Sequence, residues 1–187
     1  MEVLTKTEVF MRKNEIIAKI KEGAIFVYPT DTIYGIGCNA LLEKSVSRIR
    51  EIKERVTNPF SVWAPTIKWI KDICNEPHCK ELASKLPGPY TFIIRLKKKG
   101  VVAKSVNLDG ETLGVRYPNH WFGKIIEEAG VPIVTTSVNK AGNPFMTDLK
   151  NMDKDVEQNV DFIIFEGEKE ARPSKIINLA EGMVKER

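Results

Sequence analysis

Short apolar runs alternate with longer amphipathic segments along most of the chain. Several runs have the length and the β-branched or aromatic content of buried strands: residues 24–29, 60–65, 91–96, 112–118, 131–138, 161–167 and 174–180. Between them, apolar residues at near-helical spacing predict helices over residues 8–22, 43–54, 66–74, 79–86, 120–130 and 147–160. This alternation predicts an α/β fold in which helices flank one mixed sheet of about seven strands.

The first predicted helix has recognisable ends. Thr7 is the expected N-cap, because its hydroxyl can accept a hydrogen bond from the first free backbone amides. Gly23 follows the last apolar position and can adopt the left-handed backbone that ends helices. The pattern therefore predicts one helix that leads into the strand at 24–29.

Composition narrows the class of protein. The chain has 187 residues, of which 42% are hydrophobic and 29% charged, and no linker or repeat divides it, so we expect one domain over residues 1–187. Its three cysteines include no CxxC spacing, which favours a reducing compartment. The N-terminal segment has neither a signal-peptide core nor a membrane span, so we expect a cytoplasmic protein without a membrane partner.

The segment YPTDTIYGIG, residues 28–37, carries the most specific chemistry. It follows an apolar run, so a buried strand delivers hydroxyl groups, a carboxylate and two glycines to one turn. Glycines let the backbone approach whatever Thr30, Thr32 and Tyr34 contact. The segment predicts either a small-ligand site or an ordinary polar loop at the end of a strand.

Three basic residues occupy positions that suggest anionic partners. Lys53 and Arg55 lie at a helix end just before Asn58, and such a pair suits a polyphosphate; the alternative is a helix end whose cations interact with the macrodipole. Arg116 lies inside an otherwise apolar strand, so it needs either an acidic residue of the fold or a ligand carboxylate. Each position taken alone leaves both interpretations open.

Polar residues also follow the predicted strand at 131–138. Ser137 and Asn139 share one face if the strand continues, so both could donate hydrogen bonds to a phosphate or a ribose; the alternative is a capped loop. The net charge of +4 favours a polyanionic partner such as nucleotide phosphates or RNA. The lysine row at 97–99 predicts either a solvated strand end or an RNA contact.

Other catalytic classes find little support. The chain has no GxSxG elbow, no GxxxxGK[ST] phosphate loop and no HExxH zinc helix. Cys74, His78 and Cys79 have poor spacing for zinc, so we expect no protein-held metal.

Taken in order, the segments YPTDTIYGIG, KERVTNPFSV, LPGPYTF, GVRYPNH, TSVNKAGNP and PSKIINL resemble the YrdC-like family, the L-threonylcarbamoyladenylate synthases, in their short single-domain form. The resemblance implies one YrdC-like domain, built on a twisted mixed sheet flanked by helices. It also implies a nucleotidyltransferase that converts L-threonine, bicarbonate and ATP to threonylcarbamoyl-AMP and pyrophosphate. Mg²⁺ is then expected to accompany ATP.

The same resemblance implies a place in tRNA modification. The product would serve the threonylcarbamoyladenosine modification of tRNA position 37, with a downstream tRNA threonylcarbamoyl transferase as partner and with binding of tRNA or structured RNA. The alternative is a non-catalytic double-stranded RNA or tRNA-binding protein of the same fold.

The resemblance also assigns site residues by position. L-threonine is assigned to Thr30, Arg116, Thr135 and Ser174. ATP is assigned to Lys53, Arg55, Asn58, Thr112, Ser137, Asn139 and Arg187, and the catalytic group to Lys53, Arg55 and Arg116. The chain departs from the family at Trp63, where longer relatives have a histidine, at Phe145, where the family has a serine, and in the short spacing between Arg55 and Asn58.

Overall fold

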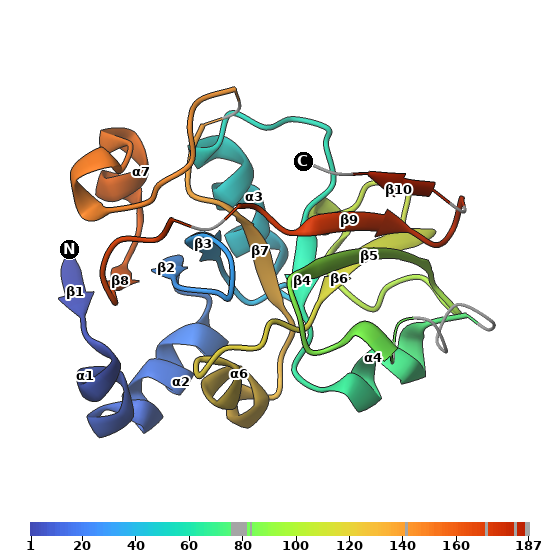
Figure 1. Ribbon diagram of the computed structural model, residues 1–187, viewed down its shortest axis with the longest axis horizontal. Helices are drawn as coiled ribbons and strands as arrows, with labels where there is room; N and C mark the ends of the chain where they lie inside the picture. The colour runs from blue at the N-terminus through green and yellow to red at the C-terminus, as the bar shows by residue number, and fades with distance from the viewer. Residues whose placement is uncertain (76–81, 83, 141, 171, 182, 186–187) are drawn as a thin grey trace.

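The computed structural model describes residues 1–75, 82, 84–140, 142–170, 172–181 and 183–185 (Figure 1). The strands are β1 (Glu2–Leu4), β2 (Phe26–Tyr28), β3 (Gly35–Gly37), β4 (Ser61–Trp63), β5 (Tyr90–Arg95), β6 (Thr112–Arg116), β7 (Ile133–Ser137), β8 (Phe162–Ile164), β9 (Lys175–Asn178) and β10 (Met183–Lys185). The helices are α1 (Lys6–Met11), α2 (Lys13–Glu22), α3 (Glu43–Ile52), α4 (Ile67–Ile73), α6 (Gly123–Ala129) and α7 (Lys154–Asn159), with 3-10 turns η1 (Lys104–Val106) and η2 (Leu149–Asn151).

The strands of the described residues form one sheet of ten, in the order β1-β8-β2-β3-β7-β4-β6-β5-β9-β10. Parallel pairs such as β2 with β8 and β4 with β6 occur beside antiparallel pairs such as β3 with β7, so the predicted mixed α/β sheet is confirmed. The expected number of about seven was too low, because β1, β3 and β10 lie outside the seven apolar runs from which strands were predicted.

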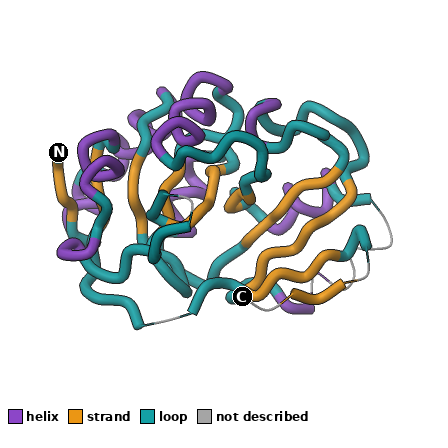
Figure 2. The backbone as a smooth tube through the Cα atoms, turned by 90° about the horizontal axis from the view of Figure 1, so that it is seen from above, coloured by secondary structure: helices purple, strands orange, loops and turns teal. Residues whose placement is uncertain are grey.

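Strand β7 joins the two halves of the sheet, since it pairs with β3 on one side and β4 on the other. β3 can approach β7 closely because residue 37 is a glycine. A Cβ added at Gly37 would lie 2.1 Å from the Val134 carbonyl oxygen. Seen from above, β5, β6, β9 and β10 lie together at one end of the molecule and the N-terminal helices at the other (Figure 2).

Two apolar clusters cover the opposite faces of the sheet. Phe26 and Tyr28 of β2 belong to a cluster with residues of α2 and α6, whereas Val27, between them, belongs to a cluster with α3. Successive strand residues point to opposite faces, so three residues of β2 contact both layers. Helices therefore lie on both sides of the sheet, as Figure 1 shows.

Several predicted helices have different bounds. The helix expected over 8–22 is two helices, and the first is capped by Thr5, whose hydroxyl accepts from the Glu8 amide, so the Thr7 cap was wrong. Gly23 ends α2 in the left-handed conformation, with φ of 100°, as predicted. The helix expected over 147–160 is broken into η2 and α7, and half of the residues of the one expected over 79–86 lie outside the described residues.

No helix in the described part of the chain combines the length and the apolar character that crossing a membrane requires.

Candidate two-part binding cleft

Two adjoining cavities lie over the middle of the sheet, where β7 joins its halves. The first, of about 270 Å³, is lined by residues of β3, β4, β6 and β7 and of the segment before β9. The second, of about 370 Å³, extends over β5, β6 and β9. Both cavities are bordered by Arg55, Pro59, Phe60, Ser61, Thr91 and Ile176, so they form one cleft with two compartments.

Arg116 lies at the end of β6 and lines the first cavity, although its side chain is almost fully buried. Its Nη2 donates to Asp31 Oδ1 and to Thr32 Oγ1, each at 3.0 Å. Its Nε is shielded from solvent and has no hydrogen-bond partner among the described residues. Burial lowers the pKa of Arg116, and the charge of Asp31 opposes that shift. Arg116 therefore gives the first cavity a cationic wall.

Hydroxyl groups also line the first cavity. Thr135, Thr136 and Ser174 line the first cavity, and Ser174 Oγ lies 2.7 Å from Thr91 Oγ1. Thr135 is buried, whereas Ser174 reaches the cavity from the segment before β9. Beside Arg116, these groups suit a small ligand that carries a carboxylate and further polar atoms.

Thr30 has a different environment, because it lines neither cavity. Its hydroxyl donates to the Ile33 carbonyl at 2.7 Å and accepts from the Thr32 amide at 3.1 Å. These bonds fix the turn that brings Asp31 and Thr32 to Arg116. In this structure Thr30 supports the first cavity from behind.

The segment after β8 is anchored to the same turn. Lys169 Nζ donates to the Thr30 carbonyl at 2.9 Å and to Glu166 Oε1 at 2.6 Å. Glu166 also bonds His120 Nε2 at 3.0 Å and Trp121 Nε1 at 2.6 Å. Burial alone raises the pKa of Glu166, but these hydrogen bonds outweigh it and lower the pKa to about 2. Figure 1 shows this segment crossing from β8 to β9 over the junction of the sheet halves.

Arg55 occupies the junction of the two cavities and borders both. Its Nη2 donates to the Pro59 carbonyl at 2.8 Å, and its guanidinium lies 5.1 Å from the centre of the Phe60 ring. Glu54, which precedes it, has a left-handed φ of 51°, so the chain turns sharply between Lys53 and Arg55. The side chains of Lys53 and Arg55 therefore have different surroundings.

Lys53 is the cation that turns inward. It is only 2% exposed and lines neither cavity. Its Nζ donates to the carbonyls of Ser137 and Asn139, each at 2.6 Å, and to Asn139 Oδ1 at 3.2 Å. Burial, with a smaller contribution from Arg55, lowers the pKa of Lys53 to about 7. Lys53 thus lies behind the loop that follows β7.

The remaining predicted residues divide between the two compartments and the scaffold. Asn58 and Thr112 line the second cavity, and Ser137 lines the first. Asn139 lines neither; it bonds Ser137 through Oδ1. Arg187 lies outside the described residues.

The departures from the family pattern also have definite places. Trp63 is fully buried in the apolar cluster, 5.9 Å from the ring of Tyr28 and 6.1 Å from that of Phe122, so it does not wall the first cavity. Phe145 does line that cavity and replaces a hydroxyl there with an apolar ring.

The sequence reasoning missed Arg50, which shapes the loop that carries Arg55 and Asn58. Arg50 Nη1 donates to the carbonyls of Arg55 at 3.0 Å, Val56 at 3.1 Å and Asn58 at 3.2 Å. Its Nε donates to the Ser105 carbonyl at 2.7 Å. An arginine in the last turn of a helix is ordinary, so no local signal marks this role.

The described residues contain no group of three or more His, Cys, Asp or Glu side chains that could hold a metal ion. The cleft instead presents two arginines, hydroxyls and amides. Such groups bind carboxylates, phosphates and sugars by charge and hydrogen bonding.

Comparison with known proteins gives a consistent result. The family model Sua5_yciO_yrdC, described as Telomere recombination, matches residues 18–185. A protein of Methanocaldococcus jannaschii, provisionally named threonylcarbamoyl-AMP synthase, is 36% identical over 177 residues, which cover 89% of this chain and 79% of that protein.

Solved structures agree with the sequence comparison. The crystal structure of Pyrococcus abyssi Sua5 complexed with L-threonine matches with a TM-score of 0.84 and 28% identity, over 98% of this chain and 55% of that one. This chain therefore spans little more than half of that relative. The crystal structure of Escherichia coli YciO matches with a TM-score of 0.80 over 95% of this chain and 89% of that one, and at 23% identity it supports the fold alone.

Proposed function

Because the chain belongs to the Sua5/YciO/YrdC family, we propose that it is an L-threonylcarbamoyladenylate synthase, a nucleotidyltransferase. It joins L-threonine, bicarbonate and the adenylyl group of ATP into threonylcarbamoyl-AMP and releases pyrophosphate and water. The first cavity takes the amino acid and the second takes the nucleotide. The names and the threonine complex of the relatives support this proposal.

The observation that carries the proposal is Arg116, a buried guanidinium that lines the first cavity. A guanidinium can bind a carboxylate through charge-assisted hydrogen bonds. Thr135 and Ser174 place hydroxyls beside that position, where they can contact the hydroxyl and the amine of threonine. Thr30 contributes by fixing the turn at Asp31.

ATP occupies the second cavity with its phosphates toward the junction. Arg55 faces both compartments, so its guanidinium can bind the phosphate oxygens near the amino acid. Asn58 and Thr112 contact the nucleoside side, Ser137 contacts the phosphate side, and Arg187 belongs to the same group by resemblance. Mg²⁺ arrives with the triphosphate, held by its oxygens and by water.

The chemistry then requires positioning more than acid or base groups. The threonine amine takes up carbon dioxide from bicarbonate, with loss of a proton and water, to form a carbamate. A carbamate oxygen attacks the α-phosphorus of ATP while the bond to pyrophosphate breaks. Adjoining compartments hold the two reactants in line, and Arg55 stabilises the charge that moves to the leaving pyrophosphate.

The product is a reactive mixed anhydride, so an acceptor must consume it. We place the protein in the cytoplasm, where a tRNA threonylcarbamoyl transferase would transfer the threonylcarbamoyl group to adenosine at tRNA position 37.

The test is an assay with purified protein, ATP, Mg²⁺ and labelled bicarbonate. Threonine should give a labelled adenylate and one equivalent of pyrophosphate, whereas serine and valine should give much less. Serine lacks the methyl group of threonine and valine lacks the hydroxyl, so the pair reports on both features. Pyrophosphate release that does not depend on the amino acid would contradict the assignment of the first cavity.

A non-catalytic RNA-binding role is the second candidate. Arg95 and the lysines at 97–99 line a third depression of about 300 Å³, at the end of β5. Only Lys99 of this row is paired with a carboxylate among the described residues, at 3.6 Å from Glu111. Salt-sensitive binding of structured RNA, together with no adenylate formation, would favour this role over the synthase.

A further inference from the structure

A cluster of polar side chains beside the first cavity centres on the Glu166 carboxylate. Glu166 Oε1 lies 3.0 Å from His120 Nε2 and accepts from Lys169 Nζ at 2.6 Å. Its Oε2 accepts from Trp121 Nε1 at 2.6 Å. His120 Nδ1 accepts from the Phe122 amide at 3.2 Å, so the ring proton lies on Nε2 and points to Glu166. Three donors therefore hold this carboxylate in one orientation, and its side chain is only 24% exposed.

Lys169 connects Glu166 to the turn that follows β2. Its Nζ donates to the Thr30 carbonyl at 2.9 Å as well as to Glu166, so one ammonium bonds both. Residues 33–35, at the end of this turn, line the first cavity. The segment that carries Glu166 and Lys169 continues to Ser174, which also lines that cavity. The cluster thus joins two parts of the cavity wall.

His120 connects Glu166 to the segment that follows β6, which bonds the same turn. The Asn119 amide donates to Asp31 Oδ2 at 3.0 Å, and Asp31 Oδ1 accepts from Arg116 at 3.0 Å. The position of the turn therefore determines where Asp31 meets the cation of the first cavity. A side chain that fixes the turn acts on that cavity without lining it.

We propose that Glu166 is a positioning residue for the amino-acid compartment. It keeps the Lys169 ammonium on the Thr30 carbonyl and thereby fixes the turn over residues 30–35, while the other two donors of the cluster orient the carboxylate. Glu166 lines neither cavity, so it acts only through these partners. The identity of the amino acid rests on the proposed function, whereas the action of Glu166 on the turn does not.

A second set of contacts keeps the segment after β8 attached when the carboxylate is removed. Tyr34 Oη donates to the Gly167 carbonyl at 2.6 Å and accepts from the Glu166 amide at 3.1 Å. The Phe165 ring stacks on the Tyr34 ring, with their centres 5.7 Å apart. These contacts use the backbone of Glu166 and a neighbouring ring, so a substitution of the carboxylate leaves them in place. We therefore expect a folded variant in which the turn is less ordered.

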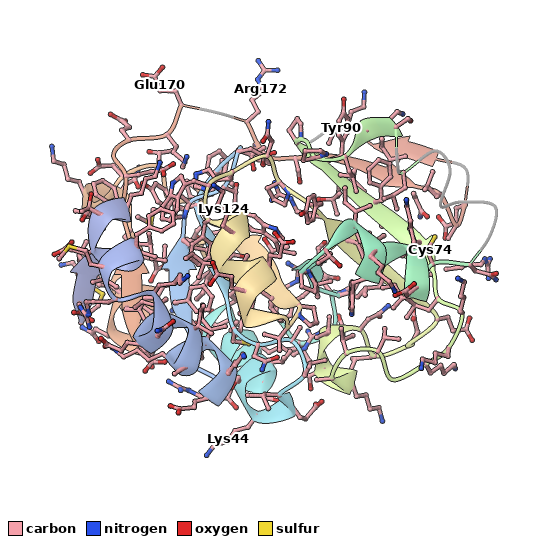
Figure 3. All side chains as sticks on the ribbon, turned by 90° about the horizontal axis from the view of Figure 1, so that it is seen from below. Lys44, Cys74, Tyr90, Lys124, Glu170 and Arg172 are labelled. Atoms are coloured by element: carbon pink, nitrogen blue, oxygen red, sulfur yellow. The ribbon has the colours of Figure 1, made fainter. Side chains whose placement is uncertain are left out.

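The first experiment needs no ligand. Amide hydrogen exchange is measured at Thr32 and Asn119, whose amides bond side chains of the turn. Glu166→Met should speed both exchange rates about tenfold relative to the unchanged protein, because Lys169 loses its anionic partner. The control is Glu170→Met on the same segment, since Glu170 is exposed and points away from the body in Figure 3. Unchanged exchange at both amides in Glu166→Met overturns the proposal.

The second experiment is a double-mutant cycle on the threonine KM. Glu166→Met and Lys169→Met should each raise that KM about tenfold, and the double variant should also stay near tenfold, because both act on one contact with the turn. The kcat and the ATP KM should stay within about twofold. Effects that multiply to about a hundredfold would mean that the two residues act independently, which overturns the proposal. A lower kcat with an unchanged threonine KM would indicate a structural role alone and also overturns it.

The two experiments separate the two hypotheses. If Glu166→Met does not fold, Lys169→Met and Trp121→Phe still test the connection, since both must raise the threonine KM and leave the ATP KM unchanged. If the unchanged protein makes no adenylate, the proposed synthase activity is wrong, and the exchange data alone decide the role of Glu166.

Discussion

Two buried cations, Arg116 in the wall of the cleft and Lys53 behind it, use their donors in opposite ways. Arg116 bonds Asp31 through Nη2 but leaves Nε without a partner in the described part of the chain. Lys53 donates to oxygens of Ser137 and Asn139 and lines neither cavity. Arg116 keeps one donor without a partner among the described residues, whereas Lys53 donates three hydrogen bonds to the fold.

The cost of burial explains why this difference is informative. Removing a cation from water costs several kcal/mol, and burial lowers the pKa of both side chains. A buried donor that remains unsatisfied adds a further penalty, which any hydrogen-bond acceptor that reaches it would remove. We therefore expect loss of Arg116 to act on ligand binding directly and loss of Lys53 to change how stability depends on pH.

The largest expected effect follows replacement of Arg116. Arg116→Met should lower kcat/KM for threonine about a thousandfold, because the carboxylate loses its cation in a buried site. The ATP KM should change much less. Steady-state assays with each substrate varied in turn measure the two effects separately.

Stability must be controlled in this test, because Asp31 would be left without its 3.0 Å partner. Adding Asp31→Asn to Arg116→Met should restore the melting temperature without restoring the use of threonine. Arg95→Met, at an exposed position on the neighbouring strand β5, should leave both unchanged. Normal threonine kinetics in either Arg116 variant would remove this side chain from the substrate site.

The sequence predicted more of the fold than of the site's internal order. The predicted runs cover all or most of β2 and of each strand from β4 to β9, whereas β1, β3 and β10 lie outside them. The early helix break at Arg12 and the cap at Thr5 depend on local hydrogen bonds that several nearby residues could have supplied.

Most of the cleft residues could be predicted from the sequence, but the orientations of their side chains could not. Thr30 and Ser174 look alike as hydroxyl groups near strand ends, yet one bonds its own turn and the other lines the cavity. Lys53 and Arg55 are two positions apart and diverge because of the left-handed residue between them. The partners of Lys53 lie 84 and 86 positions away, and spacing along the chain cannot reveal such contacts.

The second largest effect is expected from Arg55, which borders both cavities, unlike Lys53. Arg55→Met should raise the ATP KM about 30-fold, because a guanidinium bonded to phosphate is worth more than a neutral hydrogen bond. The threonine KM should change less than twofold, since Arg116 remains. A larger effect on threonine than on ATP would show that the compartments are assigned the wrong way round.

A smaller effect is expected from Arg50, which holds the Arg55 loop by its carbonyls. Arg50→Met should lower the free energy of unfolding by about 2 kcal/mol and raise the ATP KM about fivefold. Arg48→Met on the same helix is the control, because Arg48 is exposed and belongs to neither cavity of the cleft. Chemical denaturation and ATP kinetics give both numbers. Equal values for the two variants would mean that the carbonyl contacts of Arg50 do not order the loop.

The smallest expected effect is a change of the free energy of unfolding with pH that depends on Lys53. It compares the cost of burying the Lys53 charge with the stabilisation that its hydrogen bonds give. With a pKa of about 7 in the fold and near 10.4 when unfolded, Lys53 binds more protons in the unfolded state between these values. Stability should therefore rise with pH from about 7.5 to 9, by about 1 kcal/mol per pH unit relative to Lys53→Met. Denaturant unfolding at closely spaced pH values measures the difference. Parallel pH profiles would mean that the carbonyls of Ser137 and Asn139 compensate the buried charge fully, which would make Lys53 a permanent cation behind the cleft.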